Sequence, residues 1–262
     1  MWLTIRIMKR IHLLLIFVFT IFFAVSARES NVNIGFKGET ISINSSDGIK
    51  IKADIYEIRK KNPPVILLFH QAGFSRGEYR EIAPLLNDLG FNCIAIDQRS
   101  GKGVNGIKNE TFLEASEKGL GVKYPDAFPD LESALKFAVK RYPLKKIIVW
   151  GSSYSASLVF VLANKYPDKI NGVAAFSPGE YFKFNGKEIK EYAKSIKCPV
   201  FITSAKKEHG YWKGIYENIP EGNKTYFLPE SEGVHGSRAL WKTNSSHKDY
   251  WKALKIFLTK FK

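Results

Sequence analysis

The chain has 262 residues, 45% of them apolar, and no Gly/Ser-rich or Pro-rich linker divides it, which indicates one globular domain with one substantial core. The formal net charge of +15 raises the question of nucleic acid or an anionic surface as a partner. The lysines are, however, spread along the whole chain without an arginine-rich tract or a nucleic-acid motif, so we expect no nucleic acid partner.

The first residues have the pattern of a secretory signal peptide. Three basic side chains within residues 6–10 precede a nearly unbroken apolar run, residues 11–25, and small residues follow it. We expect cleavage after Ala27, export to the periplasm or the medium, and a mature domain of residues 28–262 without stable membrane insertion. The alternative is an uncleaved anchor, although the run is short for a membrane span of about 20 residues.

Beyond the signal peptide, strand-like and helix-like segments alternate. Two segments with alternating apolar residues, 40–44 and 49–56, flank a Ser-Ser-Asp-Gly sequence that suits a hairpin turn. Continuous apolar runs, typical of strands buried on both faces of a parallel sheet, then occur at residues 65–69, 93–96, 147–150, 173–176, 200–203 and 225–228. Apolar residues at helical spacing predict helices over residues 79–89, 131–142, 155–166, 187–196 and 248–261.

This order of elements predicts an α/β fold with a doubly wound, mostly parallel sheet and an N-terminal antiparallel hairpin. Residues 98–129 form the longest irregular stretch, and loops of that size are often functional. Only about 20 residues separate Phe176 from Cys198, so we expect no large lid domain. Four lysines between residues 187 and 197 lie on one side of a predicted helix and are expected to form its solvated face.

The strongest motif is Gly151-Ser-Ser-Tyr-Ser155, which lies directly between a buried strand and a helix. It matches the G-x-S-x-G nucleophile elbow, with serine in its last position. The residues two before and two after the nucleophile must be small, because the strand and the helix approach each other closely there. We therefore predict that Ser153 is a catalytic nucleophile.

A serine hydroxyl is a weak nucleophile, so it needs a base, and the base needs an acid to orient it. Among the histidines, only His235 lies in a glycine-flanked loop after the last strand, from which it can reach the carboxyl edge of the sheet. Glu208 follows the end of a buried strand and precedes His235, so we predict it as the acid. The rival acids, each of which is otherwise a surface charge, are Glu217, Glu221, Glu230 and Glu232.

Hydrolysis through a serine also needs donors for the developing oxyanion. The strand of residues 65–69 ends in His70-Gln-Ala-Gly73, so we expect the oxyanion hole to combine the backbone N–H of Tyr154 with that of Ala72 or Gln71. Residues that follow sheet edges or motif positions are candidates to contact the substrate, although core packing explains each of them at least as well: Gln71, Phe74, Tyr181 and Trp212.

With these motifs, the chain from about Ser45 to its C-terminus resembles the α/β-hydrolase superfamily, and particularly its dienelactone-hydrolase-like serine esterases. The resemblance rests on the elbow, the order of serine, acid and histidine, the His70–Gly73 segment and the Asp97-Gln-Arg-Ser-Gly101 turn. It implies hydrolysis of an ester or thioester bond in a small-molecule substrate through an acyl-enzyme, without a metal or an organic cofactor. It also implies a structural role for the Asp97 turn.

The chain departs from the family pattern at three positions. Ser155 replaces a glycine, Gln71 stands where the family usually has a glycine, and Glu208 replaces the commoner aspartate. Two alternatives stay open: a peptidase or amidase on the same scaffold, and a non-catalytic binding protein with this fold.

The two cysteines, Cys93 and Cys198, each open a strand-like run, and an exported protein is in a compartment that permits a disulfide. The sheet order that the resemblance implies separates their strands by four positions. We therefore expect both thiols to be unpaired and buried.

Overall fold

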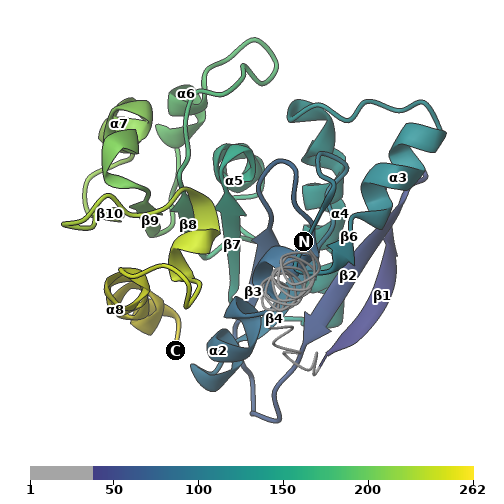
Figure 1. Cartoon of the computed structure of the whole chain (residues 1–262), viewed down its shortest axis with the longest axis horizontal. Helices are drawn as coiled ribbons and strands as arrows, with labels where there is room; N and C mark the ends of the chain where they lie inside the picture. The colour runs from purple at the N-terminus through teal and green to yellow at the C-terminus, as the bar shows by residue number, and fades with distance from the viewer. Residues whose placement is uncertain (1–37) are drawn as a thin grey trace, which may run out of the picture. The chain divides into compact units, whose positions relative to one another are not determined.

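The computed structural model describes residues 38–262, which lie within one compact unit, Phe36–Lys262 (Figure 1). The expected signal peptide and its cleavage site lie outside the described residues, as does the start of the expected 28–262 domain, so these remain predictions. Within the described part, no helix is both long enough and apolar enough to cross a membrane.

A single large sheet forms the middle layer. Its strands are β1 (Glu39–Asn44), β2 (Lys50–Tyr56), β3 (Val65–Phe69), β4 (Asn92–Ile96), β7 (Ile147–Ser152), β8 (Gly172–Phe176), β9 (Val200–Thr203) and β10 (Lys224–Phe227). Their spatial order is β1-β2-β4-β3-β7-β8-β9-β10. β1 and β2 form the predicted hairpin, β2 is antiparallel to β4, and the later pairs are parallel. The predicted doubly wound, mostly parallel sheet is thus confirmed.

Helices cover both faces of this sheet. On one face lie α4 (Phe128–Arg141), α5 (Tyr154–Lys165), α6 (Ile189–Ala193) and α7 (His209–Asn218), which contribute Leu131, Val159 and Trp212 to one core. On the other face lie α2 (Ile82–Asp88) and α8 (His247–Leu258), whose Leu86 and Leu254 belong to a second core. α5 is buried almost all round, because neighbouring helices and the sheet enclose it (Figure 1).

The helix predicted over residues 187–196 is shorter in the structure, where α6 is flanked by turns. Its lysine-rich side is solvated as expected, since Lys187 and Lys194 are exposed whereas Ile189 and Ala193 are buried.

The irregular stretch of residues 98–129 has short elements of its own: β5 (Gly103–Val104), β6 (Ile107–Lys108), α3 (Glu110–Glu117) and η2 (Pro125–Ala127). Helix α7, which was not predicted from the sequence, follows η3 (Lys206–Glu208) and buries Trp212 and Ile215. The helix predicted from Tyr79 begins instead as η1 (Arg76–Tyr79) and continues as α2 from Ile82.

Candidate active site

Ser153 lies on the sharp turn between β7 and α5, with φ of 61° and ψ of −123°. A positive φ is unfavourable for a residue with a Cβ atom, and such strain is concentrated at functional sites. A Cβ atom on Gly151 would lie 2.3 Å from the carbonyl oxygen of Ser155, so only glycine fits there. The Ser155 hydroxyl donates to the carbonyl oxygen of Phe69 at 2.7 Å, which explains how serine replaces glycine at the end of the motif.

The structure brings the predicted acid and base together. Nδ1 of His235 lies 2.7 Å from Oε1 of Glu208. Glu208 ends η3 just after β9, and His235 precedes η4 (Gly236–Leu240), which follows β10. The four rival glutamates named above are exposed.

Glu208 is held by more than the histidine. Its Oε2 accepts hydrogen bonds from the Ser177 hydroxyl at 2.7 Å and from the backbone N–H of Ala205 at 3.2 Å. Burial by itself raises the pKa of Glu208, but the hydrogen bonds from His235 and Ser177 outweigh it and lower the pKa below 4.5. An ionised carboxylate at this position stabilises a protonated imidazole.

The backbone contacts near the nucleophile distinguish Gln71 from Ala72 as the second oxyanion donor beside Tyr154. The N–H of Gln71 donates to Oε2 of Glu78 at 2.8 Å, so it is already engaged. The N–H of Ala72 has no acceptor among the described residues. Tyr154 is the first residue of α5, where a backbone N–H has no partner within the helix. Ala72 and Tyr154 are therefore the available pair.

The expected substrate contacts differ in their surroundings. The Tyr181 hydroxyl donates to the carbonyl oxygen of Ser177 at 2.8 Å. Burial raises the pKa of this tyrosine to about 12, and the Ser153 side chain is among the groups that oppose that rise, so Tyr181 lies near the nucleophile. Phe74 is half-buried and stacks on Trp241, with ring centroids 6.1 Å apart.

The other two candidates offer little surface. Gln71 is buried, and a Cβ atom on Gly236 would lie 2.4 Å from its amide oxygen. Trp212 is fully buried in the core, and its indole N–H donates to Ser204 at 2.8 Å. This placement argues against a substrate contact by Trp212. Although Trp212 follows the end of β9 in the chain, it lies on the side of α7 that faces the core.

One aromatic residue at the site, Tyr124, was not predicted from the sequence. Tyr124, from the 98–129 stretch, stacks on Tyr154 with ring centroids 4.7 Å apart and stays 38% exposed. Phe182 meets Tyr124 edge to face at 6.3 Å. No periodic pattern marks Tyr124, because it lies in a turn that only the tertiary fold brings over α5.

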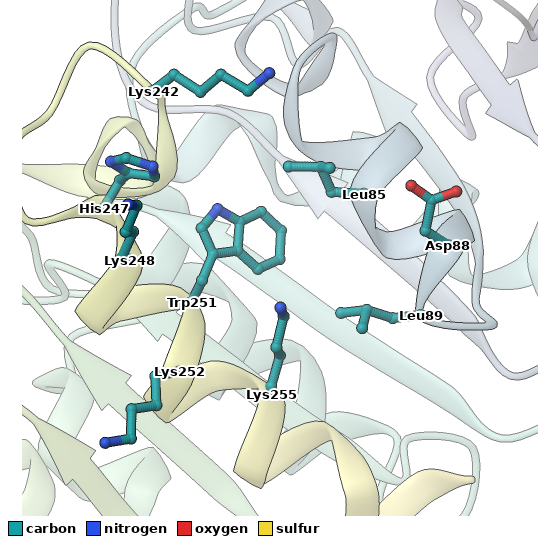
Figure 2. Close-up of a pocket in the computed structure, with 9 residues that line it drawn as sticks. All are labelled: Leu85, Asp88, Leu89, Lys242, His247, Lys248, Trp251, Lys252 and Lys255. Atoms are coloured by element: carbon teal, nitrogen blue, oxygen red, sulfur yellow. The ribbon is translucent and has the colours of Figure 1, made fainter.

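A cavity of about 510 Å³ lies elsewhere, between α2 and α8 (Figure 2). The Trp251 indole faces Leu85 and Leu89 there, and lysine side chains surround it. None of the predicted site residues lines this cavity. Among residues 38–262, no group of three or more His, Cys, Asp and Glu side chains is arranged to hold a metal ion.

The sequence matches the family model described as alpha/beta hydrolase fold over residues 64–249. It is also 28% identical over 168 residues to an uncharacterized hydrolase of Saccharomyces cerevisiae. That match covers 62% of this chain and 52% of the yeast protein, so the chain spans about half the length of this relative.

Solved structures with the same fold include a dienelactone hydrolase of Anabaena variabilis, with a TM-score of 0.67 and 14% identity, covering 86% of this chain and 98% of that one. An esterase of Pyrococcus furiosus aligns with a TM-score of 0.61 and 18% identity, covering 90% of this chain and 96% of the esterase. At such identities the likeness concerns the fold.

Proposed function

Because the chain belongs to the α/β-hydrolase family, we propose that it is an exported serine hydrolase that cleaves carboxylic ester or thioester bonds. In this proposal Ser153 is the nucleophile, His235 the general base and Glu208 the acid that orients it. The observation that carries it is the 2.7 Å contact between His235 Nδ1 and Glu208 Oε1, combined with the strained turn at Ser153.

The proposed first half-reaction forms an acyl-enzyme. With its Nδ1 proton directed at Glu208, His235 has Nε2 free to take the proton of Ser153 as the hydroxyl attacks the ester carbonyl. The negative charge that develops on the carbonyl oxygen is bound by the N–H groups of Ala72 and Tyr154. The protonated imidazole then gives its proton to the leaving alcohol or thiol.

The second half-reaction reverses these roles. Water enters in place of the leaving group, His235 removes one of its protons, and the hydroxide attacks the acyl carbon. Collapse of the intermediate releases the carboxylic acid and returns the proton to Ser153. The ionised state of Glu208, supported by its lowered pKa, stabilises the imidazolium in both halves.

Tyr181 and Tyr124, which stacks on the buried Tyr154, are the proposed contacts of the acyl group. Tyr181 and Tyr124 are 37% and 38% exposed, so each keeps free aromatic surface. Phe74 lies beyond the oxyanion segment and is the proposed contact for the leaving group.

Labelling with a fluorophosphonate probe tests the nucleophile directly. We expect the wild type to be labelled at Ser153, as located by mass spectrometry of the tryptic peptide, and Ser153→Ala to stay unlabelled. Ser152→Ala is not a suitable control, because the Ser152 hydroxyl donates a hydrogen bond to Glu78. Ser116→Ala, on the distant helix α3, is a suitable control. Absence of labelling in the wild type would favour a non-catalytic binding protein.

Substrate class is tested with p-nitrophenyl acyl esters of graded chain length beside peptide p-nitroanilides. We expect hydrolysis of the esters and little or none of the anilides. The opposite preference would support a peptidase or amidase on this scaffold.

A further inference from the structure

Glu78 is a second glutamate at the site, and neither half-reaction uses it. It lies in η1, with no exposed surface. Its Oε1 accepts a hydrogen bond from the Ser152 hydroxyl at 2.7 Å, and its Oε2 accepts one from the backbone N–H of Gln71 at 2.8 Å. The Glu78 carboxylate thus connects Ser152, which precedes the nucleophile, with Gln71, which precedes the oxyanion donor Ala72.

The same carboxylate reaches the loop of the base through Ser152. The hydroxyl oxygen of Ser152 accepts the backbone N–H of Ser237 at 2.8 Å. Directly before it in the chain, the N–H of Gly236 donates to the Ser177 hydroxyl at 2.8 Å, and that hydroxyl donates to Glu208. The backbone N–H groups of the two residues after His235 therefore each donate to a serine hydroxyl that in turn donates to a glutamate.

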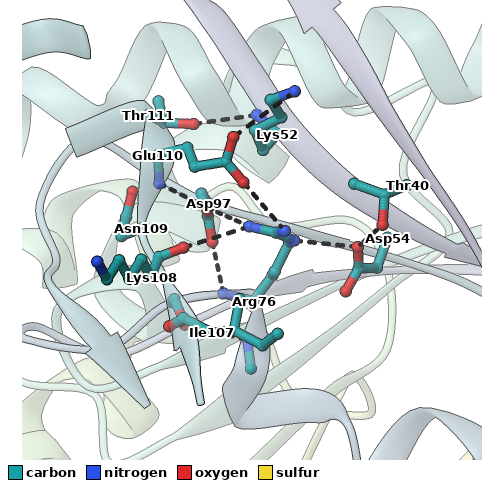
Figure 3. Close-up of polar contacts among 12 residues, drawn as sticks. Thr40, Lys52, Asp54, Arg76, Asp97, Ile107, Lys108, Asn109, Glu110 and Thr111 are labelled. Atoms are coloured by element: carbon teal, nitrogen blue, oxygen red, sulfur yellow. Dashed lines mark hydrogen bonds and ion pairs between the residues drawn. The ribbon is translucent and has the colours of Figure 1, made fainter. Parts of the chain in front are cut away.

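The short helix η1, which carries Glu78, is held in place by an ion-pair network around Arg76 (Figure 3). The Arg76 guanidinium lies 2.6 Å from a carboxylate oxygen of Asp97 and 3.0 Å from one of Asp54, and both acids are buried. Asp97 also accepts the backbone N–H of Arg76 at 2.7 Å. These contacts attach η1 to the end of β4, in agreement with the structural role expected for the Asp97 turn.

We propose that Glu78 is a positioning residue, which holds the oxyanion segment, the nucleophile elbow and the base loop in their catalytic arrangement. The inference rests on the function proposed above. Both of its partners donate to it, so the arrangement requires an ionised carboxylate: a protonated acid or an amide carries hydrogen that one of the two partners would have to accept. Gln71 N–H cannot accept, and if the Ser152 oxygen accepted from residue 78 as well as from Ser237, the Ser152 hydroxyl would lose the acceptor of its own proton.

The charges around Glu78 bear on its ionisation. Burial raises its pKa to about 7, while the hydrogen bonds from Gln71 and Ser152 and the charges of Arg238 and His235 oppose that rise. The nearby hydroxyls of Tyr79 and Tyr154 stay protonated, because burial raises both pKa values, and so do the charge of Glu78 at Tyr79 and chiefly that of Asp130 at Tyr154. Near neutral pH, protonated and ionised forms of Glu78 are therefore both populated, and only the ionised form positions the site.

The test compares the wild type with Glu78→Gln, which keeps the size of the side chain and removes its charge. At pH 8 we expect kcat for p-nitrophenyl acetate to fall about 10- to 100-fold, because small displacements of reacting groups have effects of this size, while KM stays within about twofold. Glu81→Gln is the matched control, since Glu81 lies three residues further on and contacts Lys242 outside the site; it should behave as wild type.

The pH dependence separates positioning from a merely structural role. Below about pH 7 the wild type itself carries a proton on Glu78, so the ratio of wild-type to Glu78→Gln kcat should fall toward one between pH 8 and pH 5. If Glu78→Gln does not fold, Ser152→Ala carries the test, with an expected loss of about 30-fold in kcat, because the hydroxyl loses two hydrogen bonds, one to Glu78 and one from Ser237.

A ratio below twofold at pH 8, or one that does not change with pH, would overturn the role of Glu78 while leaving the proposed function intact. A wild type that neither hydrolyses esters nor reacts with fluorophosphonate would overturn the proposed function and the positioning role together. The two failures are therefore distinguishable in one set of measurements.

Discussion

His235 Nδ1 and Glu208 Oε1 lie 2.7 Å apart although the two residues are 27 positions apart in the chain. The sheet explains the meeting, because β9 and β10 are parallel neighbours and each residue follows the carboxyl end of one of them. Ser153 follows the end of β7 in the same sheet. Side chains from the same edge of a parallel sheet converge in this way, which is where ligand sites of such sheets occur.

The first prediction concerns the nucleophile and the base. Ser153→Ala and His235→Ala are each expected to remove nearly all turnover without unfolding the protein, since triad residues act as a unit. The measurement is kcat/KM for p-nitrophenyl acetate, with circular dichroism as the control for folding. Retention of more than about a tenth of the wild-type kcat/KM, a loss under about 1.4 kcal/mol, would contradict the assignment.

The second prediction concerns the acid. Glu208→Gln should lose less activity than His235→Ala, because the carboxylate orients and stabilises the imidazolium without taking the proton. Glu230→Gln is the matched control, since Glu230 is an exposed glutamate on the neighbouring loop. Full activity of Glu208→Gln would point to another carboxylate.

The sequence predicted the parallel strands and the sharp turn at Ser153, because buried runs and motif spacing are local patterns, and the order of strands predicted that Glu208 and His235 would meet. It did not predict α7, although Trp212, Ile215 and Ile219 have helical spacing and are buried. Nor did it predict Glu78 or Tyr124, whose surroundings come from distant segments. In the sequence, an isolated glutamate after a glycine is typical of an exposed charged residue, and only the tertiary fold shows that Glu78 is buried.

The third prediction tests the close approach at the elbow. Gly151→Ala places a methyl group against the backbone of Ser155, so we expect a loss of stability of about 1–3 kcal/mol and a loss of activity. In the control Gly214→Ala, in the middle of α7, nothing lies within 4 Å of the new atom. That change should stabilise the protein by about 0.5–1 kcal/mol. Urea unfolding measures both, and equal effects would contradict the packing argument.

The fourth prediction follows from the pKa of Glu78, which burial raises from 4.5 to about 7 in the folded protein. The folded state then binds more protons than the unfolded state between these values, so this group's contribution to stability is present below pH 4.5 and is lost as pH rises toward 7. Glu78→Gln lacks this loss. The free energy of unfolding of Glu78→Gln minus that of wild type should therefore increase from pH 4.5 to 7. A constant difference would mean that Glu78 does not titrate in this range.

The last prediction concerns Cys93 and Cys198. The sheet order confirms that four steps separate β4 from β9, about 19 Å at about 4.8 Å a step, whereas a disulfide requires Cα atoms within about 7 Å. Both cysteines are free in the structure, but the expectation that both are buried is wrong for Cys198, which lies in a bend two residues before β9 and is half-buried.

The burial of the two thiols gives the order in which they should react. Burial raises the pKa of both, that of Cys198 to about 11, and Cys93 has no exposed surface at all. Under native conditions, iodoacetamide should therefore modify Cys198 slowly and Cys93 more slowly still, and both should react after unfolding without a reductant. Mass spectrometry of the alkylated peptides measures this. An intramolecular bridge between them would overturn the strand order and the fold with it.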